Sequence, residues 1–208
     1  MRTRYLQTAL LLVGVAALAN AAASAQTDVA ASLYGAFTGA SRGNDTIQSP
    51  SNAAGGLIEL RHISHPWLGY EGTYALNRAN QKYSFAAVPA SCPSSGCGVT
   101  LNSVSANAHE VTGDWVASLK IGNLRPFVLA GGGILIDAPS SGQASTSTST
   151  KPVFVYGGGV DWRLLPHIGL RLQYRGNLYK APDLTTVFTS TGAFTHTAEP
   201  MIGIFFRL

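Results

Sequence analysis

The sequence predicts an all-β fold of eight antiparallel strands that run up and down a barrel. Three features indicate this fold. Alternation of apolar and polar residues recurs throughout residues 26–208, a helical period of 3.6 is almost absent, and the connections are short and long in turn. Such alternating connections place all long loops at one end, which is typical of barrels that cross a bacterial outer membrane.

The first residues predict export. Arg2 and Arg4 precede a short apolar run at 10–19, and an Ala-Ser-Ala cleavage site follows it. This order is typical of a secretory signal peptide, and the run is shorter than the roughly 20 residues of a membrane-spanning helix. We expect residues 1–25 to be removed and residues 26–208 to form one barrel domain. Removal of the two arginines lowers the formal charge from +4 to +2.

Eight segments carry the alternation, and each has about the 9–11 residues, or more, that a tilted strand needs to cross a bilayer. They are Asp28–Thr38, Gly56–Ser64, Leu68–Asn77, Ala108–Ile121, Arg125–Ile136, Pro152–Leu164, Gly169–Tyr179 and Thr195–Leu208. Tight connections are expected at His65–Trp67, Gly122–Leu124 and Leu165–Ile168. Long loops are expected at Gly39–Gly55, Arg78–Asn107, Asp137–Lys151 and Lys180–Phe194. The long loops would lie outside the cell, and both termini at the periplasmic end.

The composition of the two faces predicts that charged side chains point inward. Six acidic and six basic residues share the polar face: Glu59, Arg61, Glu71, Glu110, Asp114, Lys120, Asp161, Arg163, Arg171, Arg175, Glu199 and Arg207. A solvated face needs no balance of sign, whereas a narrow interior does, because an unpaired buried charge costs several kcal/mol. Since eight strands enclose only enough room for side chains, we expect an interior charge network that plugs the barrel.

The opposite face predicts contact with lipid. It carries Tyr70, Tyr74, Trp115, Phe154, Tyr156, Trp162, Tyr174 and Phe206. Aromatic side chains of this kind form girdles at the edges of a membrane barrel. The sequence therefore predicts a transmembrane β-barrel; the alternative is a soluble periplasmic barrel with its charges outside.

Cysteine and glycine patterns predict structural roles. Cys92 and Cys97 would enter an oxidising compartment, and we expect them to form a disulfide in the second extracellular loop. Two cysteines are too few for a structural zinc site, and we expect no metal or cofactor. The glycine triplets 131–133 and 157–159 lack the features of a phosphate loop, so we expect close packing of strands there.

Three stretches carry a resemblance to a known family. They are Arg125-Pro-Phe-Val-Leu-Ala-Gly-Gly-Gly133, Tyr156-Gly-Gly-Gly-Val-Asp-Trp-Arg163 and Leu170-Arg-Leu-Gln-Tyr-Arg175. The chain resembles the outer membrane protein β-barrel domain family, whose small barrels occur in Gram-negative bacteria. The resemblance implies location in the outer membrane. It also implies recognition of the last strand by the barrel-assembly machinery, although this strand ends in Leu208 where the family usually has an aromatic residue.

We expect a monomer without enzymatic activity that has a structural or surface-interaction role. Its expected partners are outer-membrane lipid and extracellular ligands of the long loops, because loops on rigid scaffolds carry function. Nucleic acid is not expected, since no cluster of Lys and Arg accompanies the small positive charge. One alternative is a low-conductance pore for small solutes. Another is a lipid-modifying barrel enzyme, for which His62-Ile-Ser64 is a weak match.

Overall fold

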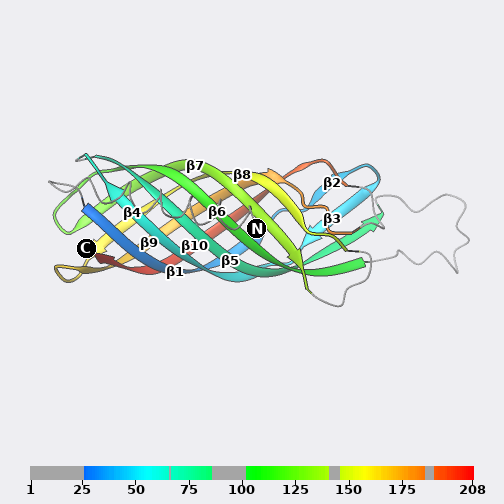
Figure 1. Ribbon diagram of the computed structural model, residues 1–208, viewed down its shortest axis with the longest axis horizontal. Helices are drawn as coiled ribbons and strands as arrows, with labels where there is room; N and C mark the ends of the chain where they lie inside the picture. The colour runs from blue at the N-terminus through cyan, green and yellow to red at the C-terminus, as the bar shows by residue number, and fades with distance from the viewer. Residues whose placement is uncertain (1–25, 66, 86–101, 141–145, 186–189) are drawn as a thin grey trace, which may run out of the picture.

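Eight long antiparallel strands close into a barrel in the computed structural model, which describes residues 26–65, 67–85, 102–140, 146–185 and 190–208 (Figure 1). The strands are β1 (Gln26–Thr38), β4 (Ala53–Ile63), β5 (Leu68–Phe85), β6 (Asn102–Ser118), β7 (Leu124–Pro139), β8 (Ser149–Arg163), β9 (Ile168–Lys180) and β10 (Phe194–Arg207). Each barrel strand pairs with the next along the chain, and β1 pairs with β10 to close the sheet. The predicted fold is confirmed. The predicted signal peptide at 1–25 and the predicted disulfide between Cys92 and Cys97 lie outside the described residues.

The tight connections lie at one end of the barrel, together with both ends of the described chain (Figure 1). Ile121 and Leu124 exchange two backbone hydrogen bonds of 2.8 and 3.0 Å around a two-residue turn. Gly122 adopts a φ of 61° in this turn, a conformation that costs glycine little. The backbone N–H of Leu208 donates to the carbonyl of Thr27 at 2.9 Å.

The long-loop end contains more strand than the sequence predicted. Within the loop expected at 39–55, β2 (Ser41–Gly43) and β3 (Thr46–Pro50) form a hairpin, and β3 pairs with the outer end of β5. Asn44 and Asp45 form its two-residue turn with φ of 49° and 55°, which both residue types tolerate. Strand β5 also continues well past Asn77. These parts lack the regular alternation with apolar residues outside, because outward positions beyond the lipid carry polar residues such as Arg78, Asn80 and Lys82.

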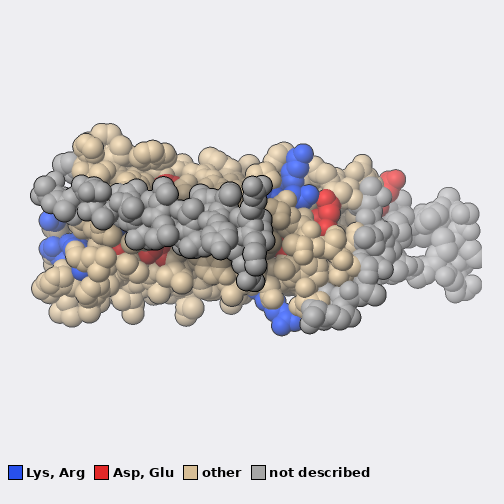
Figure 2. Space-filling view, in the orientation of Figure 1, with Lys and Arg blue, Asp and Glu red and all other residues tan. Residues whose placement is uncertain are grey.

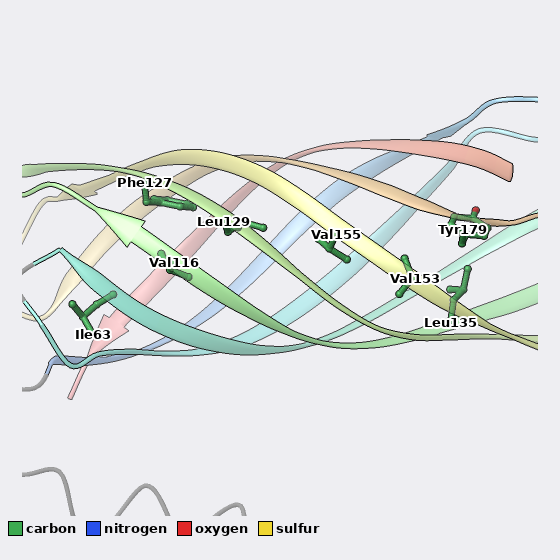
Figure 3. Close-up of a cluster of buried hydrophobic side chains, with 8 residues drawn as sticks. All are labelled: Ile63, Val116, Phe127, Leu129, Leu135, Val153, Val155 and Tyr179. Carbon is green, nitrogen blue, oxygen red and sulfur yellow. The ribbon is translucent and has the colours of Figure 1, made fainter.

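The two faces of the barrel differ as the alternation predicted. All eight aromatic residues expected to face lipid are exposed, from 38% for Tyr70 to 65% for Trp115. The inward face is mostly polar and also includes apolar clusters. The largest consists of Ile63, Val116, Phe127, Leu129, Leu135, Val153, Val155 and Tyr179 (Figure 3). This is the reverse of a soluble barrel. Among the described residues, no helix is long and apolar enough to cross a membrane.

The glycine triplets lie where neighbouring strands approach closely. A Cβ atom on Gly133 would collide with the carbonyl oxygen of Val111 on β6, and one on Gly157 with that of Tyr174 on β9. Any larger residue would therefore push the barrel wall apart at these points. Both triplets lie within strands, β7 and β8, so they have a packing role.

Candidate functional site

The interior of the barrel holds most of the acidic side chains of the protein. Eight of the ten Asp and Glu residues are buried, namely Asp28, Glu59, Glu71, Glu110, Asp114, Asp137, Asp161 and Glu199. Of the Lys and Arg residues in the described part of the chain, three are buried with them, namely Arg61, Arg171 and Arg175, and each is 0% exposed. The alternation of the strands positions them all, because every second residue points into the barrel.

The buried charges nearer the tight-turn end form a group that we call the lower cluster: Glu59, Arg61, Glu71, Asp161 and Arg171. Arg61 on β4 lies at its centre. Its guanidinium lies 3.0 Å from the carboxylate of Glu59, 2.7 Å from that of Glu71 on β5, and 3.4 Å from that of Asp161 on β8. Because β4 and β8 are not neighbours in the sheet, the contact with Asp161 crosses the lumen. One side chain thus joins three strands.

Arg171 on β9 completes the lower cluster. It donates to both carboxylate oxygens of Asp161, at 2.6 and 2.8 Å, and forms an ion pair with Glu59. A bidentate pair of this kind fixes both distance and orientation. Arg61 and Arg171 therefore share Glu59 and Asp161, and none of these four charges lacks an opposite partner.

Two aromatic rings cover the lower cluster. The Arg61 guanidinium lies 4.0 Å from the ring centroid of Phe127, and that of Arg171 lies 5.5 Å from the rings of Phe127 and Phe205. Stacking on a ring face stabilises a guanidinium while excluding water. The sequence analysis did not identify these two rings as part of the interior.

Arg175 forms a second cluster nearer the long-loop end. Its Nη2 atom lies 3.3 Å from Glu110 and donates to the Thr112 hydroxyl at 3.0 Å, while its Nη1 atom lies 3.5 Å from Asp114. Asn177 donates to the other Glu110 oxygen at 2.7 Å. These contacts connect β9 to β6 across the interior.

Beyond Arg175 lies a cavity of about 30 Å³, lined by Glu110, Asp137, Glu199 and Asn177 among others. This volume holds about two water molecules. No Lys or Arg lines it. Carboxylate oxygens of Asp137 and Glu199 have no hydrogen-bond partner in the described residues, so water is the natural partner for them.

The structure places the predicted network residues in two groups. Nine of the twelve are buried in the interior, but Lys120 is exposed, and Arg163 and Arg207 are half-buried. These three lie near the tight turns, where long side chains reach water. Asp28 and Asp137 belong to the buried set and were missed, although the alternation of β1 and β7 places both inward. The buried set is therefore rich in acids and not balanced in sign.

The alternative sites suggested by the sequence do not assemble. His62 is buried and its Nδ1 atom lies 3.0 Å from the Thr27 hydroxyl, whereas Ser64 is exposed, and the two do not hydrogen-bond to each other. Across the described residues, no three His, Cys, Asp or Glu side chains are grouped to hold a metal ion.

An outward apolar girdle around a filled, charged interior defines a small transmembrane barrel of the outer membrane. The chain belongs to the outer membrane protein beta-barrel domain family, whose family model matches residues 8–195. No curated protein matches it.

Solved structures with the same fold come from several bacteria. Neisserial surface protein A is 14% identical with a TM-score of 0.57, and the match covers 89% of this chain and 100% of that one. Ail of Yersinia pestis, crystallised with the heparin analogue sucrose octasulfate, is 15% identical with a TM-score of 0.54 and the same coverage. OprG of Pseudomonas aeruginosa is 9% identical with a TM-score of 0.54, and the match covers 88% of this chain and 96% of that one. At these identities the likeness concerns the fold.

Proposed function

We propose that the protein is a closed outer-membrane scaffold that presents its extracellular hairpin and loops to ligands outside the cell. The filled interior is the observation that carries the proposal. Arg61 and Arg171 with their carboxylate partners, under the rings of Phe127 and Phe205, occupy the lumen. A solute path through this layer would require several buried ion pairs to separate, and breaking one buried pair costs about 3–5 kcal/mol.

The extracellular end supports the role of presentation. The β2–β3 hairpin is tied to the last long loop by a 3.1 Å contact between the hydroxyls of Ser41 and Thr191 and by a 2.7 Å hydrogen bond from Asn44 to the Ser190 carbonyl. Leu184 of that loop is fully buried against Tyr83, Val104 and Ala106. An ordered surface of this kind can bind a ligand with little loss of conformational entropy.

Planar-bilayer recording of the purified protein tests the closed interior. We expect no reproducible conductance steps from the wild type, because the ion-pair layer blocks the lumen. Arg171→Ala removes part of that layer and should produce small steps, whereas Arg163→Ala, near a tight turn, should remain silent. Wild-type steps that change in Arg171→Ala would instead favour the alternative, a low-conductance pore.

We also propose that the protein is not an enzyme and is a monomer. The proposal includes the Cys92–Cys97 disulfide and recognition of β10 by the barrel-assembly machinery. His62 forms no hydrogen bond with Ser64, the nucleophile that the sequence suggested, and this supports the absence of that catalytic site. Mass spectrometry of lipid A from cells that express the protein should show no modification, and a new lipid A species would contradict this part of the proposal.

A further inference from the structure

Burial of the acids leaves the surface of the barrel strongly basic. Of the ten acidic residues only Asp45 and Asp183 are not buried, whereas nine described Lys and Arg side chains are exposed or half-buried. The segments outside the described residues after position 25 contain no charged residue at all. The positive excess of the surface is therefore a property of the whole chain beyond residue 25.

Four of these basic residues lie toward the long-loop end on β2, β5 and β9, and we call them the outer basic ring: Arg42, Arg78, Lys82 and Lys180. On β5 the outward positions begin with Tyr70, Gly72, Tyr74 and Leu76 and continue with Arg78, Asn80 and Lys82. On β9 the exposed Lys180 follows the exposed Leu178 in the same way. Each strand thus changes from apolar to basic on its outward face at the same end of the barrel.

Two members of the outer basic ring, Arg78 and Lys180, lie at the height of lipid headgroups, and the other two lie further out. Strands tilted by about 40° rise roughly 2.5 Å per residue along the barrel axis. The 13 residues of β9, which end at Lys180, therefore span about 30 Å. The apolar band of such barrels is about 25 Å tall, so Lys180 lies just beyond its outer edge, as does Arg78, ten residues after the start of β5. Lys82 lies about 10 Å further out along β5. Arg42 is paired through Ile47 with Ser84 and lies further out still. Lys120, Arg163 and Arg207 lie at the opposite edge. Figure 2 shows Lys and Arg at the left end and again right of the middle, with few charges between them.

The outer basic ring has no acidic partner in the described residues. Asp183 forms an ion pair of 2.9 Å with Lys151, and Asp45 lies in the hairpin turn. The Lys180 ammonium lies 5.9 Å from the ring centroid of Phe194, and no carboxylate of the described residues forms an ion pair with it. Next to Arg78 and Lys82, the outward positions of β5 and β6 carry neutral polar residues: Asn80, Ser103, Ser105 and Asn107.

We propose that the outer basic ring, and chiefly Arg78 and Lys82 on the β5–β6 face, binds phosphate groups on lipids of the outer leaflet. Uncompensated cations among amide and hydroxyl donors suit a phosphate, which offers several acceptor oxygens. Arg78 is the next outward residue after lipid-facing Leu76, and this position favours a membrane lipid over a soluble polyanion. The inference is independent of whether the loops bind an extracellular ligand.

Lipid titration of the purified full-length protein in neutral detergent tests the proposal. The probe is lipid A, either with its phosphates or after their enzymatic removal. We expect tighter binding of the phosphorylated form. Each basic residue near an anionic surface contributes about 1 kcal/mol, so Lys82→Gln should weaken binding about fivefold and Arg78→Gln/Lys82→Gln roughly 30-fold. Arg78→Lys/Lys82→Arg keeps both charges and should retain most of the affinity.

Lys120→Gln is the matched control, because Lys120 is an exposed lysine at the opposite edge. It should leave the affinity for phosphorylated lipid A unchanged. If Lys120→Gln and Lys82→Gln weakened lipid A binding equally, the attraction would depend on net charge alone, and the proposal would be overturned. Equal affinity for the phosphorylated and dephosphorylated forms of lipid A would also overturn it. Binding of sucrose octasulfate that requires Lys82, without binding of lipid A, would assign the site to a soluble sulfated saccharide and also overturn it.

Discussion

At the scale of single residues, the interior depends on a few arginines that each contact several acids. Arg61 contacts Glu59, Glu71 and Asp161, and its ring partner is Phe127. The acids could be predicted from the alternation of each strand. The pairing across the lumen and the inward phenyl ring could not, because both depend on which strands face each other in the closed barrel.

Loss of Arg61 should therefore destabilise the protein severely. Arg61→Met leaves three carboxylates without their shared cation, and we expect a decrease of about 3–5 kcal/mol in the free energy of unfolding. Urea unfolding followed by tryptophan fluorescence measures it. Arg163→Met is the control, since the Arg163 guanidinium donates to Asn123 near a turn and is not fully buried. We expect its effect to stay below about 1 kcal/mol, and similar losses in the two variants would contradict the role given to Arg61.

At the scale of elements, the membrane environment explains which strands the sequence revealed. Segments that contact lipid alternate between apolar and polar residues, so all eight barrel strands were predicted, six of them within three residues of their observed bounds. The exceptions are β5, which continues eight residues beyond its predicted end, and β6, which begins six residues before its predicted start. The β2–β3 hairpin and the outer part of β5 beyond Asn77 lie outside the lipid, and their outward face is polar. Only the Asn44-Asp45 pair marked the hairpin, because both residues tolerate positive φ.

The two kinds of turn should lie on opposite sides of the outer membrane. We expect an epitope peptide inserted between Asn44 and Asp45 to be detected by antibody on intact cells, because this turn belongs to the long-loop end. The same peptide between Gly122 and Asn123 should be detected only after the outer membrane is permeabilised. Detection of the second insertion on intact cells would reverse the orientation of the barrel.

At the scale of the whole molecule, most acidic side chains lie in the interior and most basic side chains lie on the surface. The interior holds eight acids and three arginines, and the remaining basic residues of the described chain are on the surface or near the turns. The sequence analysis predicted charges inside, but it assigned Lys120, Arg163 and Arg207 there as well. Alternation alone cannot tell an inward residue from one near a strand end, whose long side chain reaches water.

A closed barrel with this interior should resist sodium dodecyl sulfate until it is heated. All backbone hydrogen bonds of the barrel lie between paired strands, and closure leaves no edge for detergent to enter. We expect different mobilities for boiled and unboiled samples on an SDS gel. Arg61→Met should lower the temperature at which the mobility changes, whereas Lys82→Gln should not. Identical mobility of boiled and unboiled wild type would contradict a closed barrel.

The contact from Arg61 to Asp161 across the lumen also limits how the protein can enter the membrane. A half-barrel ending before β8 would contain Arg61 with its neighbours on β4 and β5 but would lack Asp161 and Arg171, and its polar face would be open to hydrocarbon. The free energy of inserting such an intermediate would be unfavourable, because unpaired charges in lipid are costly. Insertion and closure therefore have to proceed together, with β8 and β9 in place before the polar face leaves water.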